Sequence, residues 1–107
     1  MKELYSLYDT ILRRKAEPEE GSYTAYLFEK GMPKILKKVG EECTEVIIAA
    51  IQESDEDLIN ELNDLFYHLL VLMAERNITV EDVEKVMIER NRKEHNLKPE
   101  RKPIEIL

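Results

Sequence analysis

The sequence predicts an all-α protein that forms one domain. Its length of 107 residues suits a single domain, and 43% of the residues are apolar, which is enough to build a core. Apolar residues recur at helical spacing, without the alternation that is typical of strands. We therefore expect a helical bundle that is built around an antiparallel two-helix hairpin and completed by dimerisation. The expected boundaries are 1–96 for the domain and 97–107 for a C-terminal tail.

The first part of the chain contains signals for two helices joined by a polar linker. Apolar residues follow one stripe over residues 2–15, so we expect a helix there. The linker covers residues 16–21. Ser22 is suited to cap the start of a short second helix, and Gly31 is suited to lie just past its end.

Three further helices follow, each with a start signal in the sequence. Pro33 is suited to the first turn of a long helix. Ser54 and Thr79 each have an acid three residues later, as in a capping box, and these two residues are expected to open the next two helices. The three helices are expected to cover approximately residues 33–53, 54–77 and 79–96.

The charge balance and the cysteine content limit the partners. The 16 basic residues are outnumbered by 23 acidic ones, and the net charge of −7 argues against nucleic acid or an anionic membrane held by bulk charge. The single cysteine, Cys43, excludes an intramolecular disulfide and fits a reducing cytosol, and we expect it to pack between helices. No apolar run approaches the ~18 residues of a membrane span. We expect a cytoplasmic protein without a nucleic-acid or membrane partner.

Four acids are spaced so that a helical hairpin brings them together. Glu42 and Glu45 lie three residues apart and so share a face of the first long helix. Glu61 and Asp64 do the same on the second. Counted from the turn between the helices, Glu45 comes level with Glu61, and Glu42 comes level with Asp64. Oxygen ligands alone suit a hard cation, Mg²⁺ or Mn²⁺, rather than zinc. The alternative is a set of solvated surface acids.

Three lysines crowd the start of the first long helix. Lys34, Lys37 and Lys38 occupy its first two turns, where positive charge opposes the helix macrodipole. This placement is favourable if an anion binds at the helix N-terminus. Lys34, Lys38 and Glu42 follow one another at intervals of one turn, so phosphate anchors and metal ligands would share one stripe. In the alternative interpretation the lysines form ion pairs with acids one turn on, such as Lys38 with Glu42.

The acidic motif and the sequence around it resemble a known family. Glu41-Glu42-x-x-Glu45 followed by Glu61-x-x-Asp64 is similar to the metal motif of the all-α nucleotide pyrophosphohydrolases, the MazG-type superfamily. Within that superfamily, separate blocks in the right order resemble the phosphoribosyl-ATP pyrophosphatase family, over roughly residues 4–92. The blocks are GSYTA at 21–25, LFEKG at 27–31, KILKKVGEE at 34–42 and DLFYHLLVL at 64–72.

The resemblance implies a reaction and residues to perform it. It implies hydrolysis of phosphoribosyl-ATP to phosphoribosyl-AMP and pyrophosphate, the second step of histidine biosynthesis, by a cytoplasmic homodimer with Mg²⁺. The implied metal ligands are Glu42, Glu45, Glu61 and Asp64. The candidate catalytic residues are Glu41, Glu42 and Glu45, with Glu41 either a further ligand or a helper that positions the water. The candidate substrate-binding residues are Lys34, Lys38, Tyr23, Thr24 and His68, the last three against the alternatives of capping and packing.

Two other functions remain open from the sequence. A house-cleaning hydrolase of other nucleoside triphosphates would share the acidic motif but would not need the block around Tyr23. A non-catalytic helical dimerisation module would neither bind Mg²⁺ nor be stabilised by it. Dimerisation itself is expected because a helical chain of this size has little room for a hydrophobic core of its own. Apolar runs at 46–51 and 69–73 are also expected to face each other over a width that one helix cannot cover.

Overall fold

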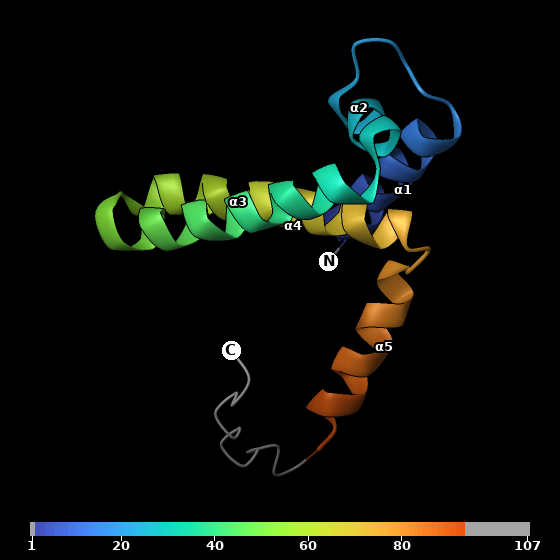
Figure 1. The fold of residues 1–107 in the computed structure, drawn as a ribbon. Helices are drawn as coiled ribbons and strands as arrows, with labels where there is room; N and C mark the ends of the chain where they lie inside the picture. The colour runs from blue at the N-terminus through green and yellow to red at the C-terminus, as the bar shows by residue number, and fades with distance from the viewer. Residues whose placement is uncertain (1, 94–107) are drawn as a thin grey trace, which may run out of the picture.

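The structure is a computed structural model that describes residues 2–93, and all regular secondary structure in this part of the chain is α-helical (Figure 1). The long helices α3 and α4 lie side by side, and α1 and α2 pack against one end of this pair. Helix α5 leaves that same end and points away from the pair (Figure 1). The prediction of an all-α protein is confirmed. The helices are α1 (Lys2–Ala16), α2 (Tyr23–Lys30), α3 (Met32–Gln52), α4 (Asp55–Glu75) and α5 (Val80–Asn91).

The junction between α2 and α3 consists of one residue, Gly31. Its backbone N–H donates to Leu27 O at 2.9 Å and its carbonyl accepts from Ile35 N at 3.1 Å, so Gly31 ends one helix and begins the next. Its φ of 78° lies in a region that side chains disfavour, which explains the glycine. At the other end of α2, the Ser22 hydroxyl accepts from Ala25 N at 3.1 Å. The predicted bounds of the short helix are therefore confirmed.

The two predicted capping boxes differ from each other. At Thr79 the box is complete, because its hydroxyl accepts from Asp82 N at 3.0 Å and the Asp82 carboxylate accepts from Thr79 N at 2.9 Å. At Ser54 the hydroxyl also accepts from the backbone, from Asp57 N at 3.2 Å. The Asp57 carboxylate accepts instead from the Ser54 hydroxyl, at 3.1 Å. The predicted box at Ser54 is therefore only half formed.

Two predicted helix ends are too late in the sequence. Helix α4 ends at Glu75 rather than near Asn77, because Asn77 has a φ of 59° and Ile78 N donates back to Met73 O at 2.8 Å. Helix α5 ends at Asn91 rather than near residue 96. Its residues are exposed beyond Glu84. The rest of that prediction, 94–96, and the predicted tail, 97–107, lie outside the described residues.

The buried core lies where α1, α2, the start of α3 and the end of α4 meet. Two polar contacts reinforce it: the Tyr8 hydroxyl donates to Ile78 O, and the Lys15 ammonium donates to Ala74 O at 2.9 Å. Lys15 thereby places a positive charge at the C-terminal end of α4, where the helix dipole favours it. The core residues are Tyr8, Ile11, Leu27, Ile35, Leu70, Val71, Ala74 and Val80.

The opposite end of the α3–α4 pair is apolar but exposed. Ile47 and Ile51 expose 59% and 75% of their surface, whereas Leu70 belongs to the core at the other end. The runs 46–51 and 69–73 therefore do not face each other, and that prediction is wrong, because an antiparallel pair places them at opposite ends. Cys43 is also exposed rather than packed between α3 and α4. No helix among residues 2–93 is long and apolar enough to cross a membrane.

Candidate active site

The middle of the α3–α4 pair carries a cluster of three carboxylates. Glu42 and Glu45 come from successive turns of α3, and Glu61 comes from α4. One carboxylate oxygen of each lies within 4.8 Å of the others. The structure thus brings together three of the four acids that the sequence predicts as metal ligands. We call Glu42, Glu45 and Glu61 the acidic cluster.

The fourth acid, Asp64, lies at the edge of this cluster. It is exposed and is not one of the three residues whose oxygens are mutually within 4.8 Å. Its negative charge still raises the pKa values of Glu42 and Glu61, so it lies within electrostatic reach of both. Asp64 is three residues beyond Glu61 on the same helix, where a modest side-chain rotation changes its distance to the cluster.

The raised pKa values and the burial of these acids show that their ionised forms are unfavourable without a cation. A hydrogen bond from Glu61 to Glu45, followed by burial and the neighbouring negative charges, raises the pKa of Glu61 to about 7. Burial, then the charge of Glu45, raises the pKa of Glu42. One oxygen of Glu42 and one of Glu61 are buried without a hydrogen-bond partner. Buried polar atoms are normally satisfied, so these oxygens fit the coordination of a hard divalent cation.

Lys38 joins the cluster to the start of α3. Its ammonium lies 3.1 Å from a Glu41 oxygen and 3.7 Å from a Glu42 oxygen. The hydrogen bond between Lys38 and Glu41 raises the pKa of the lysine and lowers that of the acid. Glu41 is exposed and faces Lys38, outside the acidic cluster. Lys34 lies close enough to lower the pKa of Glu41 further.

The remaining candidates form two side-chain contacts between α2 and α4. The Tyr23 hydroxyl lies 3.0 Å from His68 Nε2, and the other ring nitrogen of His68 lies 2.7 Å from the backbone oxygen of Asp64. His68 is 5% exposed. In the second contact, the Thr24 and Tyr67 hydroxyls are hydrogen-bonded. Helix α2 is therefore held against the helix that carries Glu61 and Asp64.

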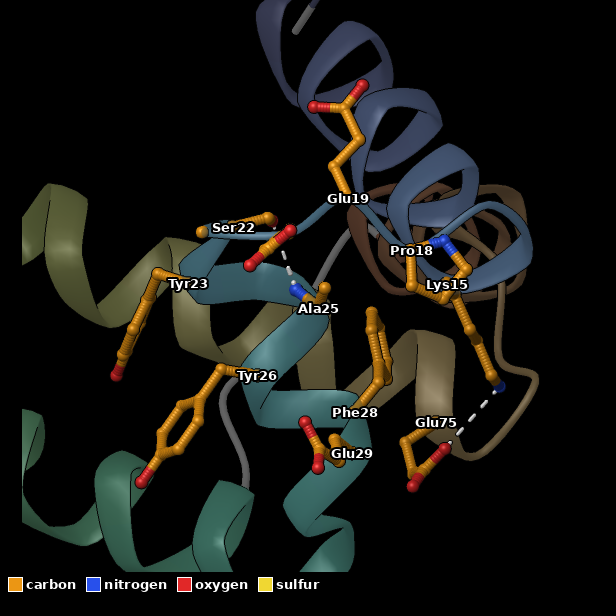
Figure 2. A pocket seen from close by; sticks show the side chains of 12 residues that line it. Lys15, Pro18, Glu19, Ser22, Tyr23, Ala25, Tyr26, Phe28, Glu29 and Glu75 are labelled. Atoms are coloured by element: carbon orange, nitrogen blue, oxygen red, sulfur yellow. Dashed lines mark hydrogen bonds and ion pairs between the residues drawn. The ribbon is translucent and has the colours of Figure 1, made fainter.

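A cavity of about 1010 Å³ lies between the C-terminal end of α1 and helix α2, and Tyr23 is one of the residues that line it (Figure 2). Tyr23 and Tyr26 stack at its edge with ring centroids 6.1 Å apart. Figure 2 shows Lys15 across the cavity, where it pairs with Glu75 at 3.5 Å. Tyr26 and Lys15 are not among the residues predicted from the sequence. The i,i+3 spacing of Tyr23 and Tyr26 was the available signal.

The chain is similar to known proteins over most of its length. The family model for phosphoribosyl-ATP pyrophosphohydrolase matches residues 4–91. A phosphoribosyl-ATP pyrophosphatase of Clostridium acetobutylicum is 60% identical over 102 residues, which cover 95% of this chain and 93% of the relative. The protein of the same name from Listeria innocua is 58% identical over 90 residues, 84% of this chain and 86% of the relative. The histidine biosynthesis bifunctional protein HisIE of Caldanaerobacter subterraneus is 58% identical over 80 residues, 75% of this chain and 39% of that protein.

Proposed function

Because the chain belongs to the phosphoribosyl-ATP pyrophosphohydrolase family, we propose that it hydrolyses phosphoribosyl-ATP to phosphoribosyl-AMP and pyrophosphate in histidine biosynthesis. The observation that carries this proposal is the acidic cluster, in which two carboxylate oxygens are buried without partners. A substrate with a triphosphate chain brings negative charge to this cluster. The site therefore needs positive charge from a cation and from lysines.

Mg²⁺ is the proposed cofactor, with Glu42, Glu45, Glu61 and Asp64 as its ligands. Oxygen donors without nitrogen or sulfur favour a hard cation. Bound there, Mg²⁺ would supply charge neutralisation and orientation at the phosphate oxygens. Asp64 would complete the set from the edge of the cluster, because its charge already acts on Glu42 and Glu61.

Lys34 and Lys38 are the proposed phosphate-binding residues. Both lie in the first two turns of α3, where the backbone dipole also favours an anion. Lys38 pairs with Glu41 and Glu42 in this structure, so a phosphate would compete with these acids for the ammonium. Catalysis of phosphoryl transfer consists mainly of positioning and charge neutralisation, which these groups provide.

Glu41 is proposed to position the attacking water. In the reaction the water oxygen bonds to a phosphorus of the triphosphate chain, the anhydride bond to pyrophosphate breaks, and the water proton passes to a carboxylate. The hydrogen bond from Lys38 holds the pKa of Glu41 below its usual value, so this carboxylate is ionised at neutral pH and accepts a hydrogen bond from the water that it orients. Tyr23, Thr24 and His68 are proposed to complete the substrate site.

We further propose that the active form is a cytoplasmic homodimer that completes the bundle around α3 and α4. The exposed apolar face near their turn supports this proposal, because monomeric proteins rarely leave large apolar patches exposed. Sedimentation at micromolar concentration is expected to give twice the chain mass. Ile47→Glu is expected to give monomers, whereas Leu12→Glu on α1 is expected to leave the mass unchanged. A wild-type monomer would contradict the proposal.

The function is tested by measuring pyrophosphate release from phosphoribosyl-ATP, ATP and a panel of deoxynucleoside triphosphates, with Mg²⁺ and with EDTA. We expect Mg²⁺-dependent turnover with a kcat/KM highest for phosphoribosyl-ATP. Higher activity on the deoxynucleotides would favour a house-cleaning hydrolase. Absence of turnover together with absence of any Mg²⁺ effect on Tm would favour a non-catalytic dimerisation module.

A further inference from the structure

Helix α5 carries an apolar stripe that its own protomer leaves exposed. Val83, Val86 and Met87 are spaced at i, i+3 and i+4, so they share one side of the helix. All three are exposed, Met87 to 63%. Among the helices of residues 2–93, α5 contacts α1 alone. An amphipathic helix normally buries its apolar stripe, and this one, which we call the α5 stripe, therefore needs a partner.

A second exposed apolar surface lies at the turn end of the α3–α4 pair. Its exposed residues, which we call the turn patch, are Ile47, Ile48, Ile51 and Ile59. The three from α3 fall within about 100° around the helix axis. Helix α4 has 21 residues and so spans about 31 Å, and α5 follows its opposite end. Figure 1 shows α5 pointing away from the pair, so it does not cover the turn patch of its own chain.

The charges beside the two apolar surfaces are opposite in sign. Four of the five residues at 53–57, next to the turn patch, are exposed acids. Exposed bases, Arg90, Arg92 and Lys93, lie at the end of α5. No ion pair among residues 2–93 involves either group. Complementary charges at the rim of an interface steer association and fix its register.

A second copy of the chain brings the two surfaces together. The α3–α4 pair and α5 form the two sides of an angle (Figure 1). A second pair that lies in this angle in the opposite direction places its turn end against α5 of the first copy. A twofold axis then repeats the contact, because each copy presents both the α5 stripe and the turn patch.

We propose that each copy of the dimer lays α5 on the turn end of the other, so that the α5 stripe of one copy covers the turn patch of the second. The bases at the end of α5 then lie beside the acids at 53–57 of the other copy. This inference rests on the proposed homodimer and names surfaces that form its interface. The apolar end of the α3–α4 pair, beyond the acidic cluster, is thereby covered by the partner.

Sedimentation equilibrium of two full-length variants tests the contact. Met87→Glu places a charge in the α5 stripe and is expected to raise the dissociation constant of the dimer at least about 100-fold. Ile88→Glu is the matched control, because it makes the same change at an exposed residue 100° further around α5, and its effect is expected to stay below about 3-fold. A wild-type dimer that both variants retain with equal affinity would overturn the α5 contact but leave the proposed dimer intact. A wild-type monomer would overturn both.

A charge exchange shows whether the contact runs between copies. One chain carries Arg90→Glu with Arg92→Glu, and an isotopically labelled chain carries Glu53→Lys with Glu56→Lys. Each alone sets like charges against each other in both contacts, whereas the mixed dimer restores opposite charges in both.

Native mass spectrometry of the mixture is therefore expected to show mainly the mixed dimer, with at least about 10-fold higher affinity than either homodimer. A control chain with Glu3→Lys and Glu17→Lys on and after α1 has the same net charge and is expected to give no such preference. A statistical mixture of dimers, or equal preference with the control chain, would overturn the proposal. Neither experiment measures turnover, so the outcome is independent of the reaction that the site performs.

Discussion

At one end of the α3–α4 pair Ile35 and Val71 are fully enclosed by α1 and α2, whereas at the other end Ile47 and Ile51 expose 59% and 75% of their surface. The acidic cluster lies between these two ends, because Glu42 and Glu45 come from the middle of α3 and Glu61 comes from α4. One end thus obtains its stability within the protomer, and the other end has apolar surface without a partner in the same chain. The site is therefore flanked by a packed core on one side only, and the other side lacks packing unless another molecule covers the exposed end.

The largest expected effect is on the acids between the two ends. Glu45→Gln is expected to lower activity about 100-fold or more and to raise the Tm of the metal-free protein, because one like-charge repulsion is removed. Mg²⁺ is expected to raise the wild-type Tm by mass action and to raise that of Glu45→Gln or Asp64→Asn much less. Melting curves with and without Mg²⁺, together with kinetics, measure both effects. Glu89→Gln on α5 is the control, and an equal Mg²⁺ response in all four proteins would contradict the shared cation site.

The next effect compares the two ends directly. Ile35→Ala removes a fully enclosed side chain and is expected to reduce the free energy of unfolding by about 2–5 kcal/mol at any protein concentration. Ile51→Ala is expected to change it by less than about 0.5 kcal/mol in the monomer, because its side chain is exposed. If a second copy covers Ile51, the loss will grow with protein concentration in urea titrations. A concentration-independent loss equal to that of Ile35→Ala would erase the distinction between the ends.

A pH effect is expected in the metal-free protein. The pKa of Glu61 is raised to about 7 from 4.5, so the native state retains a proton that the unfolded chain releases between these values. Stability is therefore expected to fall as pH rises from about 4.5 to 7 and then to level off, by linkage. Calorimetry in EDTA of wild type and Glu61→Gln isolates this contribution as their difference. Parallel Tm–pH curves for the two proteins would be inconsistent with the raised pKa.

The smallest expected effects concern the two helix caps. Thr79→Ala and Ser54→Ala are each expected to reduce the free energy of unfolding by about 0.5–2 kcal/mol. Thr79→Ala should have the larger effect, because it breaks the hydroxyl half of a complete box near the core, whereas Ser54 lies at the exposed turn. Urea unfolding at low protein concentration provides the comparison. A larger loss for Ser54→Ala would indicate that the turn end contributes more to stability than its burial suggests.

The sequence was sufficient for features that depend on near neighbours. Ser22, Gly31 and Thr79 act as predicted because a cap is made with residues three or four positions away. The approach of Glu45 to Glu61 followed from helical periodicity and a short turn alone. In these cases local geometry determines the outcome, so no knowledge of the tertiary fold was needed.

Features that depend on tertiary packing could not be predicted in the same way. The contact between Tyr23 and His68 joins residues 45 positions apart, and it depends on how α2 is placed against α4. Cys43 follows the buried Glu42 by one residue, and a 100° step around the helix is enough to expose it.

The single-residue junction at Gly31 makes α2 a lever arm. Helix α2 is eight residues long, so Tyr23 at its far end lies about 12 Å from the pivot. A change of only 10° at the pivot would move Tyr23 by about 2 Å, which exceeds the tolerance of a hydrogen bond to His68. The backbone angles of Gly31 therefore determine where the Tyr23 hydroxyl lies in the proposed site. A small rotation at Gly31 is therefore enough to misplace Tyr23 relative to His68.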